Sequence, residues 1–285
     1  MNRGGDPDLL SAFQDALGGG RLNMAYQPNI SLADGKLARV EALARWNDPE
    51  LGDIGPSRFI PLAEQNGCID ALTIWGLTRI LEQWSAWREC GMECCIAFNI
   101  SAVSLENLDF PDIVERLCKS LGVPTDCLVL ELTEGATQPL IKLMDTLTRF
   151  RIKGIRLAID DFGTGYSSLL QLRRLPFTEV KIDRAFVSDS DRSKDSALIV
   201  KTVIDLAHGL GLTATAEGVE TLAQLELLRD LGCDHAQGFL IAEPLAPDEL
   251  GPWCDAFGAR WSEFTSAPQS PSPVRKVEAH ALGQG

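Results

Sequence analysis

Five carboxylates, an amide and a lysine stand at or near the ends of short apolar runs in this 285-residue sequence. They are Glu41, Glu131, Asp160, Asp161 and Glu217, together with Asn99 and Lys181. Two like charges about 4 Å apart repel by roughly 4 kcal/mol at an effective dielectric near 20, so such a cluster must be partly protonated or bind cations. Hard oxygen ligands with one amide and no Cys or His suit Mg²⁺ or Mn²⁺.

The adjacent pair Asp160 and Asp161 predicts a site for two ions. One carboxylate can lie between the ions while its neighbour binds the second ion alone, an arrangement that serves phosphoester hydrolysis by activated water. The ions would also offset the charge of the phosphate and of the departing oxygen. We therefore expect a phosphoesterase.

Side-chain alternation along strands explains how these residues would meet. Eight β-branched runs predict strands, with helical patterns between most of them: 24–32, 36–46, 94–100, 127–132, 155–160, 178–183, 212–217 and 235–239. Within a run, apolar residues share one face; Leu128, Leu130 and Leu132, for example, oppose Val129 and Glu131. The polar faces, including that of Gln237, would point into the interior near the carboxyl ends of the strands, where barrel enzymes carry their active sites.

The fold class is therefore predicted as α/β, a (β/α)8 barrel of the TIM type with an antiparallel first strand. Only residues 33–35 separate the first two strands, which indicates a hairpin, because parallel neighbours need a longer crossover. An open doubly wound sheet is the alternative, although no strand is followed by a G-x-G-x-x-G turn.

The chain has no internal linker that would divide it. We expect a flexible N-terminus over residues 1–7, one domain over residues 8–261, and a disordered tail rich in Pro and Ser over residues 262–285. The eight cysteines are scattered through apolar runs without metal or disulfide spacing, which predicts reduced core residues.

Charge and hydropathy restrict the partners. Lys and Arg total 26 against 40 Asp and Glu, so the formal charge of −14 disfavours binding to duplex nucleic acid or to an anionic membrane. No signal-peptide pattern and no membrane-spanning apolar run is present, so we expect a cytoplasmic protein. A phosphate substrate would need cations bound locally.

A series of motifs resembles the EAL-domain cyclic di-GMP phosphodiesterase family. The signature Glu41-Ala42-Leu43 is followed by Ala44-Arg45-Trp46. Other motifs match in family order: Tyr26-Gln27-Pro28, Asn99-Ile100-Ser101, Glu131-Leu132-Thr133-Glu134, Asp160-Asp161-Phe162-Gly163, Lys181-Ile182-Asp183-Arg184, Ala216-Glu217-Gly218 and Gln237-Gly238-Phe239. The resemblance covers roughly residues 8 to 258.

The resemblance implies a barrel with two Mg²⁺ or Mn²⁺ ions that hydrolyses cyclic di-GMP to linear 5′-pGpG. The first ion would bind Glu41, Asn99, Glu131 and Asp160, and the second Asp160, Asp161 and Glu217. Lys181 would position or deprotonate the attacking water, and Glu41 and Glu217 also receive catalytic roles. Gln27, Leu43, Arg45 and Gln237 would contact substrate. Glu134 would stabilise the loop 161–168.

A non-catalytic cyclic di-GMP receptor or protein-interaction scaffold of the same fold is the rival interpretation. Such members usually lose one or more ligand positions, whereas this chain retains those identified. Asp183 and Glu220 could contact metal-bound water or brace neighbouring segments. An apolar contact through Leu169, Leu170 and Leu172 predicts a homodimer. The sequence identifies no regulatory partner.

Overall fold

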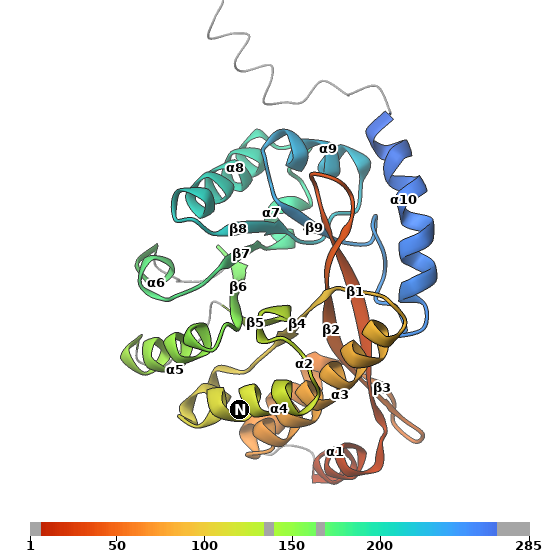
Figure 1. Cartoon of the computed structure of the whole chain (residues 1–285), viewed down its shortest axis with the longest axis vertical. Helices are drawn as coiled ribbons and strands as arrows, with labels where there is room; N and C mark the ends of the chain where they lie inside the picture. Colours follow the sequence, from red (N-terminus) through yellow and green to blue (C-terminus); the bar gives the residue numbers. More distant parts are fainter. Residues whose placement is uncertain (1–6, 134–139, 164–168, 267–285) are drawn as a thin grey trace, which may run out of the picture.

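Eight strands close a barrel in the computed structural model, which describes residues 7–133, 140–163 and 169–266 (Figure 1). The barrel strands are β1 (Leu22–Ser31), β2 (Leu37–Asp48), β4 (Cys95–Asn99), β5 (Leu128–Thr133), β6 (Arg156–Phe162), β7 (Glu179–Ile182), β8 (Thr213–Ala216) and β9 (His235–Gln237), and a ninth strand, β3 (Gly52–Ile54), pairs with β2 outside the closed ring. Their order is β1-β9-β8-β7-β6-β5-β4-β2-β3, and β1 also pairs with β2. The predicted barrel is confirmed and the open doubly wound sheet is wrong.

The first strand runs against the rest of the barrel. β1 pairs antiparallel with both β2 and β9, while the pairs from β2 and β4 round to β8 and β9 are parallel. The hairpin between β1 and β2 turns at Gly35, whose φ is 72°. Its N–H donates to the Ser31 carbonyl at 2.8 Å, and a Cβ would lie 2.1 Å from the Trp261 ring. Both the positive φ and the close approach require glycine.

Helices cover the outside of the barrel (Figure 1). They are α1 (Pro7–Gly19), α2 (Pro56–Gln65), α3 (Ile69–Glu89), α4 (Phe110–Ser120), α5 (Leu140–Ile152), α6 (Leu169–Arg174), α7 (Arg184–Val187), α8 (Lys194–Gly209), α9 (Leu222–Asp230) and α10 (Leu250–Ser266), with 3₁₀ turns at Ala102–Glu106 and Thr125–Cys127. α1 includes Pro7, and α10 runs five residues into the expected tail. The outer ends of these two helices therefore lie one and five residues beyond the ends of the predicted domain.

Strand alternation separates the face that packs against the helices from the face inside the barrel, as predicted. Leu130 and Leu157 are fully buried in the large core between strands and helices. Ala97, Val129 and Ala158 form a separate cluster on the opposite strand face. Burying one Leu side chain contributes about 1.5–3 kcal/mol, so a one-residue register slip would lose the core and misplace every inward polar residue.

A second apolar cluster braces the end of β2. The rings of Phe13 in α1 and Phe59 in α2 lie 5.6 and 6.2 Å from the ring of Trp46. Strand β3, which the sequence did not predict, pairs with β2 from Trp46 to Asp48. This packing fixes the segment that follows Glu41.

The cysteines are free thiols, but only three are fully buried: Cys94, Cys118 and Cys233. Cys68, Cys127 and Cys254 are partly buried and pack against the core clusters, whereas Cys90 is exposed, so the expectation of a core residue is wrong for Cys90. Of the helices described, none combines the length and apolar character needed to span a membrane.

Candidate active site

A cavity of about 390 Å³ opens at the carboxyl ends of the parallel strands. Its lining includes most of the predicted site and adds several residues: Gln27, Glu41, Leu43, Arg45, Asp160, Asp161, Asp183, Arg184, Glu217, Gly218, Glu220, Gln237, Gly238, Phe239 and Pro244. Because parallel strands begin and end in step around a barrel, residues distant in sequence meet on one floor.

Lys181 is the centre of this floor. Its side chain is 1% exposed, and Nζ contacts four carboxylates. The distances from Nζ are 2.6 Å to Glu131, 2.7 Å to Glu217, 3.3 Å to Asp160 and 3.5 Å to Glu41. A single ammonium group therefore faces four acidic side chains, contributed by strands β2, β5 and β6 and by the residue after β8.

Two amides hold Glu41 in place. Asn99 Nδ2 donates to one carboxylate oxygen and Gln237 Nε2 to the other, each at 2.7 Å. Gln237 Nε2 also donates to Gln27 Oε1 at 3.1 Å, and Gln27 Nε2 donates to the Ala242 carbonyl at 3.1 Å. The amide chain runs from β9 through β1 and fixes the orientation of Glu41 before any ligand binds.

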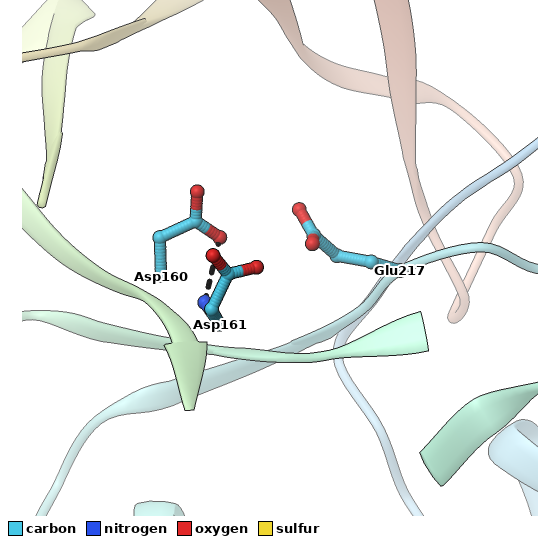
Figure 2. A group of neighbouring side chains, drawn as sticks. All are labelled: Asp160, Asp161 and Glu217. Atoms are coloured by element: carbon cyan, nitrogen blue, oxygen red, sulfur yellow. Dashed lines mark hydrogen bonds between the residues drawn. The ribbon is translucent and has the colours of Figure 1, made fainter. Parts of the chain in front are cut away.

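Asp160, Asp161 and Glu217 bring carboxylate oxygens within 4.8 Å of one another (Figure 2). Asp161 adopts a left-handed conformation with φ at 54°, which is uncommon outside glycine. Its N–H donates to Asp160 Oδ1 at 3.0 Å. The β6–β7 register shifts between Ile159 and Phe162, and this irregularity lets two consecutive carboxylates enter the same cavity.

Burial raises the pKa of several of these carboxyl groups, by different amounts. Burial raises the pKa of Glu131 well above its usual range and also raises the pKa of Asp160. Burial raises the pKa of Glu217 to about 8 against the opposing effect of Lys181. Burial and then Asp160 raise the pKa of Asp161 to about 6.

Glu41 and Lys181 behave differently. Burial alone would raise the pKa of Glu41, but Lys181, Gln237 and Asn99 together lower it. Burial would lower the pKa of Lys181, but its carboxylate neighbours, Glu131 first, raise it well above the usual range. Glu41 and Lys181 therefore form the charged pair, and the remaining carboxyl groups are short of counter-charge.

The donor set fits divalent cations. Glu131 Oε1 and Gln237 Oε1 are buried without a hydrogen-bond partner among the described residues. Orphaned oxygens beside surplus carboxylates are expected where a cation or water binds. The ligands available are carboxylate and amide oxygens, which Mg²⁺ and Mn²⁺ prefer.

The residues expected to contact substrate lie around the same cavity. Gln27, Leu43, Arg45 and Gln237 all line it. Leu43 also borders an adjacent apolar cavity of about 290 Å³ that extends toward Trp75. The Arg45 guanidinium donates to the Ala44 carbonyl at 3.0 Å and stands at the edge of the metal-ligand cluster.

Not all of the remaining residues singled out in the sequence lie in the cavity. Asp183 lines the cavity and also accepts from the Ala185 N–H at 2.8 Å, so it caps α7. Glu220 lines the cavity as well. Glu134 and the loop portion 164–168 lie outside the described residues. Leu172, expected at a dimer contact, is 3% exposed and packs in the core, so that assignment is wrong; the side chains of Leu169 and Leu170 lie outside the description.

Sequence reasoning assigned no role to two cavity residues. Arg184 follows the Lys181 motif, and Phe239, 62% exposed, ends the Gln237 motif. A cationic and an exposed aromatic side chain at one rim suit an anionic ligand with flat rings. Their positions inside matched motifs were the available signal.

The sequence is similar to those of known proteins over most of its length. Residues 10–244 match the EAL domain family. Cyclic di-GMP phosphodiesterase NbdA of Pseudomonas aeruginosa is 42% identical over 267 residues, covering 93% of this chain and 33% of that protein. Bifunctional diguanylate cyclase/cyclic di-GMP phosphodiesterase MucR of the same organism is 38% identical over 244 residues, covering 85% of this chain and 36% of that protein.

A solved structure carries the same architecture. PaMucR phosphodiesterase in a c-di-GMP complex has 38% sequence identity and a TM-score of 0.80, covering 85% of this chain and 99% of that chain. This chain spans about a third of the length of the two curated relatives. The match over most of its residues shows that the chain belongs to the EAL domain family.

Proposed function

We propose that this chain is a phosphodiesterase that hydrolyses cyclic di-GMP to linear 5′-pGpG with two divalent ions. The convergence of four carboxylates on Lys181 in one cavity is the observation that carries the proposal. Two similar proteins support cyclic di-GMP as the substrate: NbdA is named a cyclic di-GMP phosphodiesterase, and the PaMucR phosphodiesterase was solved in a c-di-GMP complex. The acidic chain would otherwise repel a dianionic nucleotide.

The two ions would divide the ligands between them. Glu41, Asn99, Glu131 and Asp160 would hold the first, and Asp160, Asp161 and Glu217 the second. Bound Mg²⁺ or Mn²⁺ would lower the pKa of a coordinated water and neutralise charge on the phosphate. The hydrogen bonds from Asn99 and Gln237 keep Glu41 oriented for this role.

Lys181 would position the water that attacks the phosphate. Its Nζ donates to carboxylates, and these neighbours raise its pKa, so it is an ammonium. When the carboxylates bind ions, Nζ loses much of this stabilisation. Once the ammonium has released a proton to solvent, the neutral amine would orient the water and receive its proton.

The cavity rim would bind the rest of the nucleotide. Arg45 and Arg184 supply cationic donors for the phosphates, while Phe239 and Leu43 offer apolar surface to a guanine. Gln27 would contact the substrate, and the hydrogen bond that it accepts from Gln237 would hold its side chain in position.

The test is product chromatography of purified protein with cyclic di-GMP and Mg²⁺ or Mn²⁺, repeated with a chelator. We expect 5′-pGpG only when metal is present. Glu41→Gln keeps the size of the side chain and should abolish turnover. Glu89→Gln, at an exposed position ending α3, is the matched control and should leave turnover unchanged.

Two results would overturn the proposal. One is bound but intact cyclic di-GMP with both metals, which would establish the receptor interpretation instead. The other is full turnover in chelator, which would remove the metals from the mechanism.

A further inference from the structure

A pair of cysteines lies at the opposite end of the barrel from the active site. Cys95 begins β4, and Cys127 directly precedes β5. Ile96 pairs with Leu128 in the parallel β4–β5 ladder, so the register continued by one residue sets Cys95 beside Cys127. Both side chains are partly exposed free thiols.

The distance between adjacent strands suits a disulfide. Neighbouring strands lie about 4.7–4.9 Å apart, within the 4.4–6.8 Å that disulfides span between Cα atoms. Cys95 alternates with the inward residues Ala97 and Asn99, and Cys127 ends the 3₁₀ turn Thr125–Cys127 directly before β5. The two thiol groups also influence each other: Cys127 lowers the pKa of Cys95, and Cys95 raises the pKa of Cys127.

The charges around the pair favour a thiolate at Cys95. Cys127 comes first among the causes that lower the pKa of Cys95 to about 6, followed by Arg156 and Arg39 against the effect of burial. Arg156 begins the next strand, β6, and its positive charge lowers the pKa of Cys95. Cys94, the adjacent residue, is buried and its pKa is raised to about 12.

Geometry therefore separates these two thiols from the other six. Cys95 has a neighbouring thiol, an adjacent guanidinium and solvent access, which together mark reactive cysteines. Buried structural cysteines lack these features. We propose that Cys95 and Cys127 form a redox-active pair that a peroxide converts to a disulfide linking β4 to β5.

The reaction balances with one peroxide. The Cys95 thiolate attacks a peroxide oxygen, the O–O bond breaks, and a sulfenic acid forms as the first water leaves. The Cys127 sulfur then attacks the Cys95 sulfur, an S–S bond forms, and the S–O bond breaks. The departing oxygen takes the Cys127 proton as the second water, so both sulfurs are oxidised and both peroxide oxygens are reduced.

The test uses the full chain, reduced, desalted and treated with equimolar hydrogen peroxide at pH 7. Remaining thiols are alkylated, and tandem mass spectrometry of the digest locates each link. We expect a link between Cys95 and Cys127 that dithiothreitol reverses, with Cys90 and Cys94 still alkylated. Arg156→Gln should slow formation of the link several-fold, because it removes the neighbouring positive charge.

Two variants make the outcome decisive. Cys90→Ser changes an exposed thiol at the end of α3 and should leave the link unchanged. Cys127→Ser should abolish the link and leave Cys95 as sulfenic or sulfinic acid. The proposal is overturned if wild-type Cys95 and Cys127 both remain alkylated. It is equally overturned if Cys95 is over-oxidised while Cys127 remains free.

Discussion

Two layers of charge fill the barrel interior, and they are balanced differently. In the layer toward the amino ends of the parallel strands, Arg39 forms a two-pronged ion pair with Glu179, and both side chains are nearly inaccessible. Thr215 accepts from Arg39 at 3.0 Å and also bonds Glu179. In this group one cation meets one anion, and Thr215 completes the hydrogen bonds between them.

The layer at the carboxyl ends sets one ammonium against four carboxylates. Buried charges are tolerated when they are paired, as in the Arg39 layer. The Lys181 layer departs from this rule at the place where the cavity opens. The comparison teaches that excess acid in one layer marks a cation site, since the buried Arg39 and Glu179 are balanced in charge.

The largest expected effect comes from removing the single cation of the carboxylate layer. Lys181→Met should lower kcat about 10²- to 10⁴-fold, as loss of a proton-transfer group does. The assay is 5′-pGpG formation at saturating Mn²⁺. Lys201→Met on α8 removes an exposed lysine and should have no effect. Turnover within threefold of wild type in Lys181→Met would contradict the assignment.

In the balanced layer, which contains Arg39 and Glu179, a substitution should change the free energy of unfolding. Glu179→Gln leaves the Arg39 guanidinium buried without its counter-charge and should lower the free energy of unfolding by about 3–5 kcal/mol. The comparison is Glu131→Gln, which removes one surplus carboxylate and should cost much less in metal-free protein. Urea denaturation measures both. Equal losses in the two variants would show that the layers do not differ.

Metal ions should stabilise only through the unbalanced layer. At a concentration 100 times the dissociation constant, Mn²⁺ should add about 2.7 kcal/mol to the free energy of unfolding. Asp160→Asn should abolish most of that gain, whereas Glu179→Gln should retain it on a lower baseline. Thermal denaturation with and without chelator is the measurement, and a gain that survives in Asp160→Asn would place the ions elsewhere.

The layers should also differ in pH dependence, with a smaller effect. The pKa of Glu217 rises from 4.5 to about 8 in the folded protein, so the native state binds the extra proton. Stability of metal-free protein from this group is present at low pH and is lost as pH rises from 4.5 to about 8.

Glu179 has the opposite sign. Burial would raise its pKa, but Arg39 lowers it below 4.5, so its contribution is present above that pH and is lost on acidification. Urea midpoints between pH 5 and 8.5 in chelator should fall in wild type and fall less in Glu217→Gln. Midpoints that rise equally in both proteins would refute this account of Glu217.

Local patterns in the sequence predicted much of the fold. Alternation in 127–132 placed Glu131 inside because strand side chains have a period of two. The short connection before Lys36 predicted the hairpin that makes β1 antiparallel. Strand β3 was missed because Gly52–Ile54 is too short to show a period and is stabilised by pairing with β2.

Local sequence patterns could not predict which residues of distant strands would lie side by side. The same alternation puts Arg39 on the face of Glu41, but nothing local links Arg39 with Glu179, 140 residues away. The placement of Cys95 beside Cys127 also depends on strand register. Leu172 was misassigned because a helical apolar residue reads alike whether it faces the core or a partner.

The central claim is that the unbalanced layer holds two divalent ions, and counting Mn²⁺ bound per chain by equilibrium dialysis tests it most directly. Asp161→Asn is the matched variant, because asparagine tolerates the positive φ at this position. We predict two bound ions in wild type and one in the variant. A wild-type count of zero, or the same count in both proteins, would contradict the account.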